Sequence, residues 1–160
     1  MTAPQSGAGA TSGTVLGPDQ GDAYWWLGSL TINKVVGPGL TFVDHHVPAG
    51  YEPPLHIHHN QDEVFLITEG QFTMTCGEDT WPAGPGTLVF LPRGVPHRFK
   101  VSADAPGRTT IITAPGGFAE LVAELGEPAA ELTLPGPDVP IPDPARIDAV
   151  SRKHGIEAVH

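Results

Sequence analysis

Short runs of apolar residues, separated by turn-forming residues, fill the chain between residues 24 and 113. Within most runs apolar and polar positions alternate, which is typical of strands with one buried face. The separators are rich in Gly and Pro. The pattern predicts an all-β fold with strands over residues 24–32, 40–47, 63–68, 71–76, 87–91, 97–101 and 109–113.

Helical spacing appears only after the predicted strands. Four apolar residues of segment 118–125 lie on one helical face, and Gly126 can cap its C-terminal end. Asp143 and Pro144 suit the N-cap and the first position of a second helix, and Gly155 marks its end. The sequence therefore predicts a short helical appendix behind the β domain.

These patterns divide the chain into three parts. Residues 1–20 are rich in Gly, Ala, Ser and Thr without apolar periodicity, so we expect a flexible leader. Residues 21–115 hold the β domain. Residues 116–160 hold the two helices and a proline-rich connection over 134–144, which suits neither a helix nor a central strand. We expect this last part to pack on the β domain.

Composition and charge narrow the functional classes. Among 160 residues, 18 acidic and 8 basic side chains give a formal net charge of -10, which opposes binding to nucleic acid. No apolar run reaches membrane-spanning length, and no Lys or Arg precedes Lys34 as a secretory signal would require. We expect a cytoplasmic protein without nucleic-acid or membrane partners. Cys76 is the single cysteine, and alternation within 71–76 predicts a buried, inert thiol.

Two histidines two residues apart are the first sign of chemistry. His56 and His58 follow a pair of prolines that favours an extended chain, and side chains at i and i+2 of a strand share one face. His59 then points to the opposite face. We expect His56 and His58 to act as paired metal ligands and His59 not to take part.

One carboxylate and a third imidazole sit at the heads of later strands. Glu63 shares its predicted face with Phe65, so an unpaired carboxylate there would be costly to bury. A metal ion removes that cost. His97 likewise shares its face with Phe99. Taken alone, each histidine is more simply read as a hydrogen-bonded core residue. Together, His56, His58, Glu63 and His97 predict a metal site.

The spacing of these residues resembles the two motifs of the cupin superfamily. Gly50, His56, His58, Glu63 and Gly70 fit the first motif, while Gly86, Pro92, Gly94 and His97 fit the second, in which Val101 replaces the final asparagine. The wider chain is similar to bacterial single-domain, quercetin-dioxygenase-like cupins. The segments that carry this similarity are 24–28, 54–59, 62–65, 116–118 and 142–157.

The resemblance implies an antiparallel barrel of the jelly-roll type. It also implies that His56, His58, Glu63 and His97 bind one divalent transition metal per chain. Three imidazoles and a carboxylate suit Ni, Fe, Mn, Co, Cu or Zn alike, so the donor set leaves the metal open. In dioxygenases of this type, the glutamate ligand deprotonates the 3-hydroxyl of a flavonol before O2 attacks, which assigns the catalytic role to Glu63.

Predicted inward-facing residues indicate an apolar substrate that carries oxygen donors. They are Phe65, Phe72, Met74, Phe99 and Trp25, with Trp26 as the alternative to Trp25. Each of them could also simply fill the core. We expect a dioxygenase that opens a flavonol or similar aromatic enol. The alternatives are a polyketide cyclase or isomerase that uses the metal as a Lewis acid, and a non-catalytic metal-binding protein.

Two further features leave their roles open. His45 and His46 are neighbours on one predicted strand and so face opposite ways. One of them could line the site as a base or hydrogen-bond partner, or both could be ordinary surface or core residues. The Trp-rich first strand would leave an apolar edge exposed, and we therefore expect a homodimer.

Overall fold

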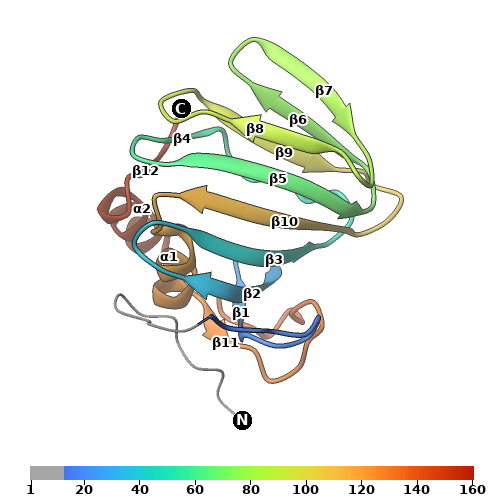
Figure 1. The fold of residues 1–160 in the computed structure, drawn as a ribbon, viewed down its shortest axis with the longest axis vertical. Coiled ribbons are helices and arrows are strands. Elements are labelled where there is room, and N and C mark those ends of the chain that lie inside the picture. The colour runs from blue at the N-terminus through green and yellow to red at the C-terminus, as the bar shows by residue number, and fades with distance from the viewer. Residues whose placement is uncertain (1–12) are drawn as a thin grey trace.

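The computed structural model describes residues 13–160, so residues 1–12 of the predicted leader lie outside the described part. Two antiparallel sheets face one another, and two short helices lie at one end of them (Figure 1). The all-β architecture with a helical appendix is confirmed. The sheets remain separate in their hydrogen bonding and do not close into one continuous barrel.

The larger sheet has seven strands and the smaller has five. The larger runs in the order β11 (Glu127–Pro128), β1 (Asp22–Trp26), β2 (Ser29–Val36), β3 (Thr41–Val47), β10 (Gly107–Ala114), β5 (Asp62–Glu69) and β8 (Leu88–Leu91). The smaller runs in the order β12 (Ile156–Ala158), β4 (His56–His58), β9 (His97–Val101), β6 (Phe72–Cys76) and β7 (Asp79–Ala83). Neighbours in sequence are often not neighbours in the sheets, as in a jelly roll.

The first predicted strand is a hairpin. Residues 24–32 divide at Leu27 and Gly28, whose φ angles of 48° and 82° allow a two-residue turn between β1 and β2. Trp26 and Ser29 form the last pair before this turn. The stretch is aromatic and apolar on both sides of the turn, so only Gly28 signals it in the sequence.

The core lies between the inner faces of the two sheets. Every second residue of β9 and β10 is buried, as the alternation predicts. Val43 and Val47 of the larger sheet and Met74 and Val101 of the smaller one are all 0% exposed. Cys76 is free and buried, so the predicted burial of its side chain is confirmed.

Three strands escape the sequence patterns. β7 contains Pro82, which the sequence suggests is part of a turn, and it forms an edge of the smaller sheet where a residue without an N–H is tolerated. β11 and β12 have only two and three residues. Such short strands exist only because a partner strand offers hydrogen bonds, and periodicity cannot reveal them.

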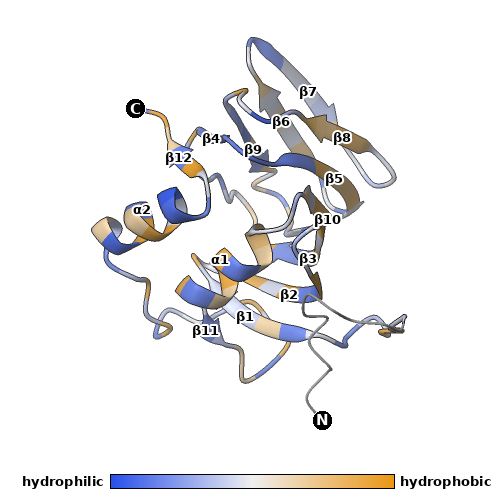
Figure 2. Ribbon diagram, turned by 60° about the vertical axis from the view of Figure 1, so that its left-hand side comes forward, coloured by the Kyte–Doolittle hydropathy of each residue, from blue (hydrophilic) through white to orange (hydrophobic). Residues whose placement is uncertain are grey.

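The two helices form as predicted but differ in how they are held. α1 (Phe118–Leu125) buries five side chains and packs against β1, β2 and β3. Gly126 ends it in an extended conformation rather than a left-handed one. α2 (Pro144–Lys153) begins where the Ala145 N–H donates to Asp143 Oδ1 at 2.8 Å, and none of its residues is fully buried. Figure 2 shows both helices on the same side of the sheets.

Exposed apolar side chains bear on self-association. The outer edge of β1 pairs with β11, so part of the edge expected to favour a dimer is covered. Leu66, Leu88 and Phe90 are exposed where β5 and β8 pair. The homodimer stays a prediction, which the molar mass in solution can test. Within residues 13–160, no helix has the length and apolar character needed to cross a membrane.

Candidate metal centre

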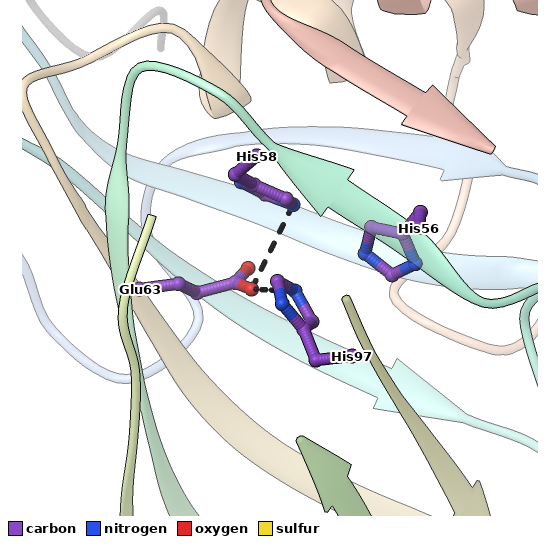
Figure 3. Close-up of side chains that lie close together, drawn as sticks. All are labelled: His56, His58, Glu63 and His97. Atoms are coloured by element: carbon purple, nitrogen blue, oxygen red, sulfur yellow. Dashed lines mark ion pairs between the residues drawn. The ribbon is translucent and has the colours of Figure 1, made fainter. Parts of the chain in front are cut away.

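Three strands bring the four predicted ligands together. β4 carries His56 and His58, β5 carries Glu63 and β9 carries His97 (Figure 3). One ligand atom from each residue lies within 4.8 Å of all the others. The pairing of His56 with His97 across β4 and β9 fixes part of this geometry. His58, Glu63 and His97 are only 2–3% exposed, while His56 is half-buried and open to one side.

The three imidazole rings are all oriented by a contact at Nδ1. Each Nδ1 lies beside an oxygen acceptor: Pro54 O at 2.8 Å from His56, Gln61 Oε1 at 3.3 Å from His58, and Val95 O at 3.1 Å from His97. A carbonyl oxygen can only accept, so Nδ1 carries the proton in each ring. This leaves Nε2 with its lone pair for a metal.

Gln61 orients His58 and was not found from the sequence. It is 3% exposed, and its amide nitrogen donates to Gly116 O at 2.8 Å while its oxygen faces His58. A Cβ added at Gly117 would come within 2.2 Å of the Gln61 amide nitrogen. Only the folded chain brings residue 61 beside residues 116 and 117, so no local pattern could reveal this role.

The donor atoms fit a cation. Glu63 Oε2 lies 3.0 Å from His97 Nε2 and 3.7 Å from His58 Nε2. Nevertheless, neither Glu63 Oε2 nor His97 Nε2 has a hydrogen-bond partner of acceptable geometry among the described residues, although both atoms are buried. A buried carboxylate oxygen and a buried imidazole nitrogen that face each other without a hydrogen bond are stabilised by a positive charge between them. A divalent metal bound by these four residues would meet that need.

The protonation states suit metal binding as well. Burial tends to raise the pKa of Glu63, but His58 and His97 outweigh it and lower this pKa to about 2. Burial lowers the pKa of His56 to about 4 and also lowers the pKa of His58. Burial would lower the pKa of His97, but Glu63 raises it. The carboxylate is therefore ionised and two imidazoles are neutral, which are the forms a metal binds.

The other histidines of this region lie elsewhere. His59 is half exposed and its Nε2 lies 3.0 Å from Glu157 Oε2, so it faces away from the cluster as predicted. His46 lies 3.3 Å from Asp44, which also accepts two hydrogen bonds from Arg108. Neither His59 nor His46 belongs to the metal-ligand cluster.

A cavity of about 270 Å³ opens directly onto the cluster. All four candidate ligands line it, together with aromatic side chains contributed by both sheets, the loops and α1. These are Trp26, Tyr51, Phe65, Phe99 and Phe118. A small molecule in this cavity would touch the metal and the aromatic wall at the same time.

Only two of the five predicted substrate-binding residues line the cavity. Phe65 and Phe99 line the cavity. Phe72 and Met74 are buried in the core behind it, with the Phe72 ring 5.7 Å from that of Phe99. Trp25 lies outside the cavity, and its Nε1 donates to Thr133 O at 2.8 Å. Trp26 takes the expected place, because adjacent residues of β1 face opposite ways and the sequence does not show which face is inward.

His45 is a further lining residue, and here the structure decides between the two histidines of β3. It is 1% exposed and its Nδ1 lies 2.8 Å from Thr31 Oγ1. Burial lowers its pKa to about 4, so the imidazole is neutral near pH 7. His45 Nε2 has no hydrogen-bond partner among the described residues and can exchange a proton with a ligand.

Charge at the cavity is balanced. Arg98 and Glu52 both line it, and their side chains form an ion pair at 3.2 Å. Lys100 lies 3.5 Å from the same carboxylate. The cavity therefore offers no unpaired cation from the described residues to attract a phosphate, and its lining favours a neutral, apolar molecule.

Comparison with known proteins agrees with this geometry. Residues 43–113, which include all four candidate ligands, match the Cupin domain family. The protein has the cupin fold. KdgF from a Halomonas species superposes with a TM-score of 0.61 at 15% identity, over 68% of this chain and 99% of that one. An RmlC-like cupin from Shewanella frigidimarina gives 0.61 at 18% identity, over 68% of this chain and 96% of the other.

Two sequence relatives match this chain over short segments. An uncharacterized protein of Streptomyces coelicolor is 39% identical over 41 residues, which cover 26% of this chain and 39% of the relative. An uncharacterized protein of Methanocaldococcus jannaschii is 28% identical over 60 residues, or 38% of this chain and 48% of the relative. The matches span less than half of either relative. They support the domain and give no information about its reaction.

Proposed function

We propose that this cupin is a metal-dependent enzyme whose apolar, oxygen-bearing substrate binds the metal directly. The observation that carries the proposal is the shared cavity, because His56, His58, Glu63 and His97 line the same 270 Å³ space as five aromatic rings. Four protein ligands leave positions open on a six-coordinate metal for a substrate oxygen. We further propose that the reaction is an O2-dependent opening of a flavonol or similar aromatic enol.

Each part of the cavity has a defined task in this reaction. A metal held there supplies Lewis-acid activation of a bound hydroxyl and, with O2, the redox chemistry. Phe99 and Tyr51, whose rings are stacked at 5.9 Å, with Phe65 beside them, orient a flat ring and exclude water. Glu63 accepts the proton of the substrate hydroxyl, and its Oε1 has no other hydrogen-bond partner among the described residues.

The decisive experiment uses protein loaded with one metal at a time. Metal content is measured first, and a flavonol is then added without O2. A shift of its absorption band shows direct binding to the metal. Admitting O2 should bleach the band with consumption of O2, and Glu63→Gln should slow this step strongly. Absence of any flavonol loss across all six metals would refute the dioxygenase proposal.

His45 supports a second candidate, a cyclase or isomerase that consumes no O2. A neutral imidazole held by Thr31 in the cavity wall can carry a proton between two positions of a substrate bound to the metal. Turnover under strict anaerobiosis, with deuterium from solvent entering the product, would favour this candidate. His45→Gln should then abolish turnover, whereas a dioxygenase that depends on Glu63 should retain most of its rate.

A further inference from the structure

A second apolar cavity of about 380 Å³ adjoins the metal cavity under the helical appendix. Trp26, His56, His58 and Phe118 line both spaces, so the two adjoin each other beside the metal ligands. The remaining wall of this groove comes from α1, α2 and β12. It includes Leu121, Ile147, Ser151, Ile156 and Ala158, and Asp148 and His160 are its polar members besides Ser151.

α2 forms one side of this groove without contributing a buried residue to the core. Ile147 is only partly buried, and Ser151 lines the groove one turn further along the same helix. Figure 2 shows α2 at one edge of the molecule, with α1 and β12, the edge strand of the smaller sheet, as its neighbours. An amphipathic helix normally buries its apolar face in the core. Here Ile147 and Val150 pack only partly against the core, and Ile147 also lines the groove.

Charged contacts hold α2 in this position. Lys153 and His154 both reach the Glu124 carboxylate of α1 at 2.9 Å, and the Arg146 side chain donates to Glu124 O at 3.2 Å. Arg152 bonds Glu157 of β12 at 3.2 Å. These contacts fix the helix on both neighbours while leaving the space between them open. The groove is therefore a supported feature of the fold.

We propose that this groove binds the apolar distal part of the substrate whose oxygen-bearing head lies in the metal cavity. The substrate class is a neutral aromatic molecule longer than one fused bicyclic ring system, with metal-binding oxygens at one end. The assignment rests on His56 and His58, which are candidate metal ligands and line both spaces. The assignment of a metal-binding head to the substrate rests on the proposed function. Binding of an apolar group in the groove does not depend on it.

Two probes with the same head separate the contributions of the spaces. 3-Hydroxychromone carries only the bicyclic head, and 3-hydroxyflavone adds a phenyl ring. Anaerobic titration of metal-loaded protein gives both dissociation constants from the shifted absorption band. Burial of the phenyl ring should make 3-hydroxyflavone bind at least about tenfold more tightly. Equal dissociation constants would overturn the proposal.

Substitutions in the groove test its location. Ser151→Trp should fill the groove and remove the advantage of 3-hydroxyflavone while leaving the affinity for 3-hydroxychromone unchanged. Ala149→Trp places the same side chain on an exposed position of α2 outside the groove lining and should change neither affinity. Ala158→Phe blocks the groove from β12, so it tests the same point if Ser151→Trp does not fold. A retained advantage in the folded blocking variant would overturn the assignment.

A metal-free arm separates failure of the groove from failure of the proposed function. Nile red should gain fluorescence in the metal-free wild type and in Ala149→Trp, and should lose that gain in Ser151→Trp. No gain in the wild type would overturn the groove as an apolar binding site. Ser151→Trp could remove the Nile red fluorescence while neither hydroxy probe shifts its absorption band. That result would refute binding of the substrate head to the metal but would still support the groove as an apolar binding site.

Discussion

Glu63→Gln should separate the role of the buried carboxylate in metal binding from its role in the fold. The amide keeps the size of the side chain, which is 3% exposed, and removes its charge. His97, which faces it at 3.0 Å, can release its proton, so the metal-free variant retains no unpaired buried charge. We therefore expect the melting temperature of the metal-free variant to stay close to that of the wild type.

The metal-loaded proteins should differ clearly. A metal at 100 times its dissociation constant stabilises the native state by about 2.7 kcal/mol, or roughly 5–11 °C in melting temperature for a chain of this size. If the amide weakens binding about a hundredfold, the same metal concentration gives about 0.4 kcal/mol, or roughly 1–2 °C. Calorimetry with and without metal measures both shifts for each candidate metal.

A matched substitution controls for the loss of a carboxylate in general. Glu157→Gln removes a carboxylate that is 40% exposed and faces His59 outside the cluster. This variant should keep the full metal-induced shift. If Glu63→Gln also keeps the full shift, Glu63 is not a ligand and the ligand set argued above is refuted.

Three other substitutions test the fold around the site. Burial raises the pKa of Tyr51 to about 12. The stability that the neutral phenol contributes is therefore complete below pH 10 and is lost as the pH rises towards 12. Between pH 9 and pH 11, the free energy of unfolding measured in urea should fall by about 1 kcal/mol less in Tyr51→Phe than in the wild type. Burial would raise the pKa of Asp44, but His46 and Arg108 hold it well below its usual range. The stability it adds is present above pH 4 and lost at lower pH, so Asp44→Asn should flatten the acid side of the stability profile measured in urea, and an unchanged slope would contradict this. Gly70→Ala should lower the free energy of unfolding measured in urea by about 1–3 kcal/mol, because φ is +80° and the new Cβ would lie 2.6 Å from Pro106 O. Gly136→Ala is the control and should leave the stability unchanged, because no atom lies within 4 Å of its new Cβ.

Local alternation was enough to predict the faces of the strands that carry the cluster. His56 and His58 are two residues apart in one strand, and Glu63 and His97 each share a buried face with a phenylalanine. Period-2 geometry is set by the backbone alone, so such faces can be predicted from sequence. The joint pattern of these four residues predicted the metal site and the resemblance supported it, but how β4, β5 and β9 come together could not be derived from local patterns because it requires the whole fold.

Features that depend on long-range pairing could not be predicted in this way. The choice of Trp26 over Trp25 follows from the β1–β2 hairpin and its position against α1. Gln61 reaches His58 and Gly116 together, although residue 116 is distant in sequence. The groove needs α2 and β12 beside the metal cavity. None of these positions can be recognised from hydrophobic periodicity within its own segment.

β4 is only three residues long, yet its position depends on two neighbours made at very different times. It pairs with β9 at His56 and His97, and with β12 over residues 156–158. A ribosome makes all four ligand residues well before residues 156–158. The outer edge of the strand that carries His56 and His58 therefore stays unpaired during synthesis until residues 156–158 have left the ribosome.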